Sequence, residues 1–219
     1  MVENATAIRR DILITAASQL GWQLPAPQAD LLLDYLALIQ KWNQVYNLTA
    51  VRDPAEMLTL HLIDSLAVIA PLRRETAGRA VTLLDVGAGA GLPGVVIAIC
   101  CPNVRVTCID TVAKKAAFVQ QVAVALKLPN LRGQHGRAEK VTAPHDVVSS
   151  RAFASLPDFI AVSQAALAPE GIWLAMKGKA PGDELALLPA GIAVFHVEQL
   201  AVPGLEAERC IVWMRKKPA

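Results

Sequence analysis

The chain has 219 residues, of which 54% are hydrophobic, and its mean hydropathy of +0.40 is high for a soluble protein. Its net charge of +2 excludes a histone-like polycation, although a local basic face could still meet nucleic acid. The longest apolar stretch, Val95–Cys101, is far shorter than the roughly 18 residues that a bilayer requires.

Three helices are predicted in the first third of the chain. The first spans about Thr6 to Leu20 and carries a helical apolar stripe at Ile8, Ile12, Ala16 and Leu20. Pro25 and Pro27 end it, and a second begins near Gln28. The stripe of this second helix contains Leu32, Tyr35, Leu36, Ile39, Trp42 and Tyr46. The third opens at Asp53-Pro54-Ala55-Glu56, which combines an acidic N-cap with proline in the first turn, and runs to Pro71.

From about Arg79, apolar β-branched runs alternate with amphipathic stretches. This alternation predicts an α/β fold with a mostly parallel sheet and helices on both faces. The last two runs, AVFHVEQLAV and ERCIVWMRKK, have no helix between them, so we expect an antiparallel C-terminal hairpin. The polar stretch 73–79 predicts a division into a helical extension, 1–75, and a sheet domain, 76–219.

A glycine-rich loop, Asp85 to Gly94, follows the first predicted strand. Glycines at 87, 89 and 91 allow a tight turn and a close approach of backbone to a ligand. The spacing is G-x-G-x-G, and Leu92 stands where the third glycine of the dinucleotide fingerprint would be.

The second predicted strand ends at Asp110, whose carboxylate could accept hydrogen bonds from both hydroxyls of a ribose. The glycine loop, this acid and the C-terminal hairpin together resemble the S-adenosylmethionine (SAM) site of class I methyltransferases. A nicotinamide enzyme remains an alternative, as does a glycine-rich turn with a structural Asp110.

The absence of certain motifs narrows the range of atoms that could accept the methyl group. The fourth predicted strand ends in Val148–Ala152 without the N/D-P-P-Y motif of enzymes that methylate exocyclic amino groups. Cys101 could serve as the nucleophile that carbon-5 methylation needs, but it follows the first helix of the sheet domain, away from the glycine loop. A target that is already nucleophilic, such as guanine N7, needs neither device, and positioning can carry the reaction.

Six motifs in order resemble the RsmG (GidB) family across nearly the whole chain. They are Lys41-Trp42-Asn43, Asn47-Leu48-Thr49, His61-Leu62-Ile63-Asp64-Ser65, Asp85 to Gly94, Gly136-Arg137-Ala138-Glu139 and Ser150-Arg151-Ala152-Phe153-Ala154. The resemblance implies a seven-stranded, Rossmann-like class I SAM-dependent methyltransferase with an N-terminal helical extension. It also implies a bacterial, cytoplasmic enzyme that methylates N7 of guanine 527 in the 530 loop of 16S rRNA, with loss of activity linked to low-level streptomycin resistance.

The resemblance also implies which residues meet SAM, namely Gly87, Gly89, Leu92, Asp110, Ala138, Glu139 and Arg151. The guanidinium of Arg151 could face a carboxylate, a phosphate or guanine O6, and we treat it as the candidate catalytic residue. Arg151 could instead be a plain surface charge. Ala88 departs from the Ser or Thr that the family often has there, which we expect to weaken SAM binding at most.

The RNA surface is harder to predict. We expect Lys177 and Lys179, after the fifth strand, and Lys114 and Lys115 to contact 16S rRNA in the small subunit. Trp42 and Tyr46 could stack on a base, but their helical spacing favours core packing. His61 is expected to be structural or to orient RNA, because attack by N7 needs no general base.

Four cysteines form no C-x-x-C pair, so we expect buried free thiols and no metal site. The N-terminus lacks a basic region followed by an apolar run, which argues against secretion. We further expect a monomer without membrane contact. Two rival functions stay open: a methyltransferase for another substrate class, and a non-catalytic assembly factor that retains SAM.

Overall fold

A seven-stranded sheet runs through the protein in the order β3-β2-β1-β4-β5-β7-β6. The computed structural model describes residues 2–218. The strands are β1 Val81–Val86, β2 Val104–Asp110, β3 Leu131–His135, β4 His145–Arg151, β5 Leu167–Lys177, β6 Ile192–Leu200 and β7 Arg209–Lys216. The α-helices are α1 Val2–Gln19, α2 Ala26–Tyr46, α3 Pro54–Met57, α4 Asp64–Leu66, α5 Ile69–Glu75, α6 Gly94–Cys100, α7 Ala113–Ala125, α8 Leu156–Ser163 and α9 Gly182–Ala186. A π-helical segment, η1, spans Leu58–Ile63, and a 3-10 helix, η2, spans Ala138–Lys140.

Strands β1 to β5 are parallel, and β7 inserts antiparallel between β5 and β6. The predicted α/β sheet with an antiparallel hairpin is therefore confirmed. Strand order reverses beside β1, which pairs with both β2 and β4. In open α/β sheets, ligands bind outside the carboxyl ends of the strands at such a switch point.

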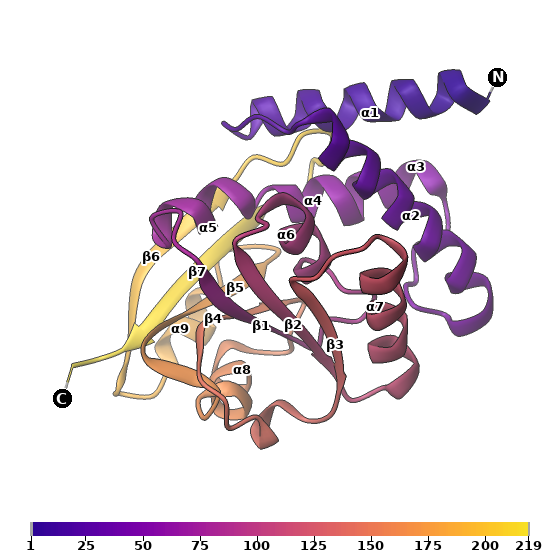
Figure 1. Cartoon of the computed structure of the whole chain (residues 1–219). Helices are drawn as coiled ribbons and strands as arrows, with labels where there is room; N and C mark the ends of the chain where they lie inside the picture. Colours follow the sequence, from indigo (N-terminus) through magenta and orange to yellow (C-terminus); the bar gives the residue numbers. More distant parts are fainter. Residues whose placement is uncertain (1, 219) are drawn as a thin grey trace.

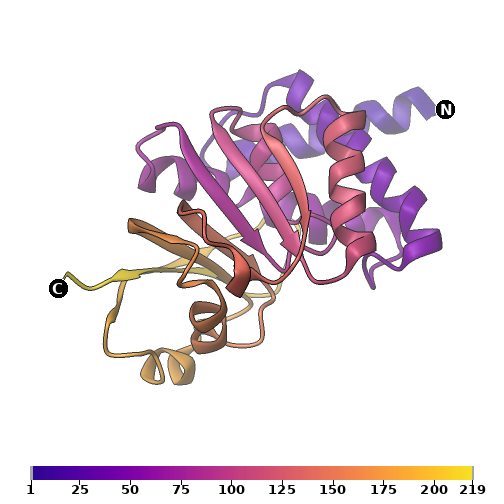
Figure 2. The same ribbon diagram turned by 60° about the horizontal axis from the view of Figure 1, so that its bottom comes forward.

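Helices cover both faces of the sheet. α6 and α7 pack on one face beneath the N-terminal helices, which Figure 1 shows gathered at the top of the molecule. α8 covers the opposite face, with the short α9 beside it (Figure 2). The first face carries the larger core, because its buried residues run without a break from α1 and α2 into β1, β2, α6 and α7.

The second predicted helix is confirmed as α2. Leu32, Tyr35 and Ile39 of the predicted stripe are fully buried. Pro27 does not precede the helix but lies in its first turn, where the missing N–H would have no helical partner.

The predicted stripe of the first helix is partly wrong. Ile8 and Ile12 are 54% and 42% exposed, whereas Leu13, Ala16 and Ala17 are buried against the rest of the core. Two neighbouring stripes of α1 are apolar, and periodicity alone does not decide which of them turns inward. Packing on α2 and η1 selects the stripe that contains Leu13.

The third predicted helix begins as expected, with the Asp53 carboxylate accepting hydrogen bonds from the backbone N–H groups of Ala55 and Glu56 at 2.8 and 3.0 Å. It does not end at Pro71. The chain resumes as α5 at Ile69, so Pro71 falls in a first turn and the helix continues to Glu75. Among the described residues, the stretch 54–75 is the one helix long and apolar enough to cross a membrane, and 72% of its apolar window is buried inside the protein.

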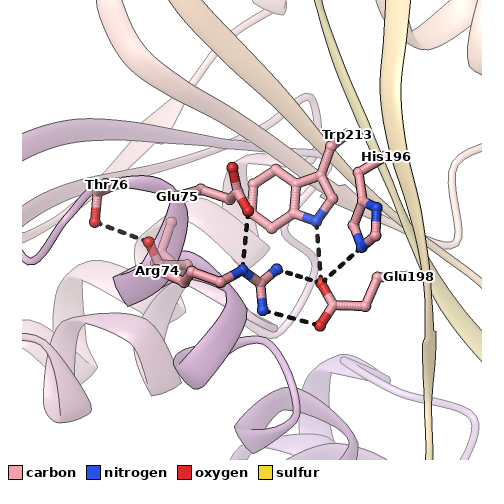
Figure 3. A network of polar contacts seen from close by, with 7 residues as sticks. Arg74, Glu75, Thr76, His196, Glu198 and Trp213 are labelled. Carbon is pink, nitrogen blue, oxygen red and sulfur yellow. Dashed lines mark hydrogen bonds and ion pairs between the residues drawn. The ribbon is translucent and has the colours of Figure 1, made fainter.

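A polar cluster ties α5 to the C-terminal hairpin (Figure 3). The carboxylate of Glu198 accepts hydrogen bonds from both terminal nitrogens of Arg74, at 2.6 and 3.2 Å. The indole N–H of Trp213 donates to the same carboxylate at 3.4 Å. The helices of 1–75 are thus joined to the sheet by ion pairs as well as by the shared core, and the division at 75/76 stays a prediction.

All four cysteines are free and buried, as predicted.

Candidate active site

The glycine-rich loop leaves the carboxyl end of β1 and enters α6. Gly87, Gly89 and Gly91 have φ values of 67°, 59° and 93°, a region that side-chain-bearing residues rarely adopt. The carboxylate of Asp85 holds the loop from below: it accepts hydrogen bonds from the N–H of Gly94 at 3.0 Å and from the hydroxyl of Ser149 at 2.8 Å. Complete burial raises the pKa of Asp85 to about 6, against the lowering effect of these hydrogen bonds.

Helix α2 supports the same loop from above. The hydroxyl of Tyr35, which is fully buried, donates a 2.6 Å hydrogen bond to the carbonyl of Ala90. Burial raises the pKa of Tyr35 well above its ordinary value, so the hydroxyl keeps its proton. The helical extension therefore fixes the conformation of the glycine loop.

Asp110 ends β2 directly beside this loop. One oxygen of its carboxylate accepts from the N–H of Gly89 at 2.9 Å, and the other accepts from the N–H of Val112 at 2.8 Å. Each oxygen keeps a further lone pair, so the carboxylate is oriented while still able to accept from a ligand.

A cavity of about 400 Å³, the Gly87 cavity, opens beyond these strand ends. Five of the predicted site residues line it, and a sixth braces its wall. Gly87, Asp110, Ala138 and Glu139 line it together with Lys115. Gly89 braces it through Asp110. Ala138 and Glu139 come from η2, which follows β3.

Three predicted residues, Leu92, Lys114 and Lys179, line neither this cavity nor the neighbouring one. Leu92 is buried in the core under the loop and lines neither this cavity nor its neighbour, so its contact with a ligand stays a prediction. Lys114 is exposed at the start of α7.

A second cavity of about 410 Å³, the Arg151 cavity, lies against the first. Phe153 lines both. Its ring also faces the glycine loop, because a Cβ at Gly87 would lie 3.9 Å from it. The remaining wall of the Arg151 cavity is formed by Val51, Leu60, His61, Asp64, Ala152, Met176, Lys177, Gly178 and Arg209.

Arg151 is not a free surface charge. Its Nη1 donates to the Asp64 carboxylate and to the carbonyl of Leu60, each at 3.0 Å. Asp64 is 3% exposed and also binds Nε of Arg209 at 2.9 Å. The sequence did not predict that Asp64 and Arg209 belong to this site, although Asp64 stands in one of the motifs quoted above.

His61 lies in the wall of the Arg151 cavity, 5% exposed. Its Nε2 is 2.9 Å from the hydroxyl of Thr49, which fixes the loop after α2. Burial, followed by the positive charge of Arg151, lowers the pKa of His61. A neutral, buried and already bonded imidazole fits the structural role expected for it.

The remaining predictions concern Trp42, Tyr46 and two lysines, and only the packing of the aromatic pair is confirmed. Trp42 stacks on Tyr46 at 5.3 Å between ring centroids and contacts Phe118 at 5.9 Å, so the expected core packing is confirmed. Lys177 lines the Arg151 cavity but is ion-paired with Glu184 at 2.8 Å, whereas Lys179 is exposed. Contacts of these lysines with RNA stay predictions.

Known proteins resemble this chain both in sequence and in fold. The family model for rRNA small subunit methyltransferase G matches residues 28–212. The chain is 67% identical over 199 residues to Ribosomal RNA small subunit methyltransferase G of Albidiferax ferrireducens, which covers 86% of this chain and 89% of that protein. Among solved structures, a mutant of MtNAS in complex with S-adenosylmethionine gives a TM-score of 0.59 at 15% identity, covering 88% of this chain and 77% of that one. A SAM dependent methyltransferase from Aquifex aeolicus gives 0.53 at 18% identity, covering 74% and 98%. These two structures establish the likeness of fold alone.

Proposed function

The chain belongs to the rRNA small subunit methyltransferase G family, and we propose that it methylates N7 of guanine 527 in the 530 loop of bacterial 16S rRNA. Its fold is that of the class I SAM-dependent methyltransferases, and its cofactor is SAM. When bound, SAM supplies an electrophilic methyl group on a sulfonium centre.

The residues around the Gly87 cavity fit this cofactor. Their glycine backbone leaves open space, since a Cβ at Gly89 would meet no atom within 4 Å. In our proposal, Gly87 and Gly89 hold the methionine portion of SAM, and Asp110 accepts from the ribose hydroxyls. Ala138 and Glu139 face the adenine edge, and Leu92 supports the loop from the core.

The single observation that carries the proposal is the pair of cavities that share Phe153 at the carboxyl edge of the sheet. One cavity suits an adenosyl group, and the other opens beside it with Arg151 in its wall. A base inserted into the Arg151 cavity would face the sulfonium past Phe153. Positioning by these walls is the contribution that the reaction needs.

The Arg151 cavity supports a target that is already nucleophilic. A general base would have to carry a free lone pair at physiological pH, and His61 is the titratable imidazole in the wall. Its Nε2 is 2.9 Å from the Thr49 hydroxyl, and its Nδ1, which has no hydrogen-bond partner among the described residues, is buried and so is not exposed to a substrate. A lone pair such as that of guanine N7 attacks without losing a proton, so the site has no proton to remove.

Mapping the modified nucleotide tests the proposal. Small subunits from a strain that lacks the enzyme are incubated with the protein and labelled SAM, and their RNA is cleaved chemically at 7-methylguanosine. We expect one cleavage, at position 527. Label on a protein or small molecule would support another substrate class, and SAM binding without turnover would support an assembly factor.

Four wider expectations belong to the same proposal. The enzyme acts in the cytoplasm and as a monomer. Its partner is 16S rRNA, either free or within the small subunit. A strain without the activity should show low-level streptomycin resistance.

A further inference from the structure

The wall of the Arg151 cavity contains a cluster of three charged side chains from three distant segments. Asp64 follows η1, Arg151 ends β4 and Arg209 begins β7. One oxygen of the buried Asp64 carboxylate binds Arg151 at 3.0 Å, and the other binds Arg209 at 2.9 Å. Because each oxygen holds one guanidinium, the carboxylate fixes the orientation of both.

Arg209 reaches this edge because β7 is antiparallel. Its neighbour Cys210 pairs with Lys177, the last residue of β5. The beginning of β7 therefore lies at the carboxyl ends of the parallel strands, where Arg151 also lies.

Both guanidinium groups keep donors available. Nε of Arg209 binds Asp64, and its Nη1 donates to the carbonyl of Glu208 at 2.8 Å. Arg151 uses only Nη1. Within residues 2–218, nothing accepts a hydrogen bond from Nη2 of either arginine. Both residues line the cavity, and their side chains are largely buried, with Arg151 20% exposed and Arg209 23% exposed.

Apart from His61 and Lys177, which is already ion-paired with Glu184, the rest of the wall is largely apolar and favours a flat ligand over an isolated phosphate. Phe153 offers an aromatic face, and Leu60 and Met176 add apolar surface. Base stacking on an aromatic ring is a general mode of recognition for unpaired nucleotides. A planar ring with a hydrogen-bond acceptor on its edge matches such a wall.

We propose that Arg209 donates a hydrogen bond to O6 of the acceptor guanine and that Asp64 is the positioning residue that orients Arg209 for it, an inference that rests on the proposed function. Guanine presents two acceptors, N7 and O6, on the same edge. N7 must stay free to receive the methyl group, which leaves O6 for the arginine. Adenine has an amino group at that position, and this hydrogen-bond donor would face the guanidinium of Arg209, which is also a donor. Arg209 is thus a specificity-determining residue.

Base replacement combined with mutation tests the inference. Small subunits are reconstituted with 16S rRNA that carries guanine, inosine or 2-aminopurine at the target position. Inosine keeps O6, and 2-aminopurine lacks it. For the wild type we expect similar single-turnover rates on guanine and inosine and a rate roughly 10- to 100-fold lower on 2-aminopurine, as for the loss of a charged hydrogen bond.

Arg209→Gln should lower the single-turnover rates of methylation of guanine and inosine by about that factor. The rate on 2-aminopurine and the affinity for SAM, measured by calorimetry, should stay unchanged. Asp64→Asn should also reduce the guanine to 2-aminopurine ratio, which a purely structural role would not alter. Arg209→Lys, which keeps the charge but not the planar fork, provides a second variant if Arg209→Gln lowers the melting temperature. The matched control is Arg215→Gln at the other end of β7, where the guanidinium lies 5.3 Å from the Phe195 ring centroid.

If Arg209→Gln lowered the methylation rate equally for all three bases, Arg209 would be a phosphate contact and the inference would be overturned. An unchanged rate on all three bases would overturn it as well. A wild-type enzyme that leaves guanine unmethylated would instead refute the proposed function, and this inference with it.

Discussion

Asp85→Asn should change the pH dependence of stability. Asp85 is fully buried, and its burial raises the pKa of the carboxyl from 3.8 to about 6. The folded protein therefore holds this proton more tightly than the unfolded chain. The resulting stabilisation is complete below pH 3.8 and is lost as the pH rises through 6. The interval corresponds to about 3 kcal/mol at roughly 1.36 kcal/mol for each pH unit.

Asparagine removes the buried charge while keeping both hydrogen bonds. Its oxygen can accept from the N–H of Gly94, and its amide nitrogen can donate to the Ser149 hydroxyl. The unfolding free energy of Asp85→Asn minus that of the wild type should therefore rise by about 2 kcal/mol between pH 4 and pH 7.5, since part of the full change already occurs below pH 4. Urea unfolding at half-unit steps of pH measures this difference, in which the titration of all other groups cancels.

Asp146→Asn is the matched control with the opposite sign. Hydrogen bonds from the backbone N–H and hydroxyl of Thr82, both 2.8 Å, lower the pKa of Asp146. Its contribution is present at neutral pH and is lost as the pH falls, so the variant should be the less stable protein at pH 7.5 and approach the wild type in acid. A difference curve for Asp85→Asn that stays flat from pH 4 to 7.5 would refute the assignment of a raised pKa to this buried carboxyl.

Three further predictions concern stability and cofactor binding. Gly133→Ala should lower the unfolding free energy by about 2 kcal/mol or more, because its Cβ would overlap the backbone carbonyl of Ala116, while Gly136→Ala should change it by less than about 0.5 kcal/mol in the same urea titration. Asp53→Ala removes the N-cap of α3 and should cost about 1 kcal/mol, measured by thermal unfolding; an unchanged melting temperature would show that the cap contributes nothing. Asp110→Ala should weaken SAM binding in calorimetry, and unchanged affinity would exclude this carboxylate from the cofactor site.

The parts of the fold set by local pattern could be predicted from the sequence. The alternation of apolar and amphipathic stretches predicted the α/β sheet, and the glycine-rich motif predicted a loop after the first strand. The inward stripe of α1 could not be predicted, because Ile12 and Leu13 are both apolar and only packing on α2 decides between their faces. The end of the third helix was missed because Pro71 falls in the first turn of a new helical segment.

The Gly87 cavity could also be predicted from local pattern, because its residues follow successive parallel strands and the ends of those strands meet at one edge of the sheet. The Arg151 cavity could not, because three long-range contacts build it. Asp64 and Arg209 are 145 positions apart, and no spacing rule links them. An arginine at the start of a C-terminal strand has no local feature that distinguishes it from a solvated charge.

Through these contacts the N-terminal helices form part of the candidate active site. Tyr35 holds the glycine loop, and Asp64 holds Arg151 and Arg209. Without the helices of 1–75, the two arginines would lose the carboxylate that orients them, and the core on that face of the sheet would be open to water. The glycine loop and Asp110 are features of the fold that binds SAM. The wall of the Arg151 cavity, which we propose to select the acceptor, is built jointly with the N-terminal helices. We therefore expect differences in substrate between proteins of this fold to reside in what packs against the carboxyl edge, and not in the sheet itself.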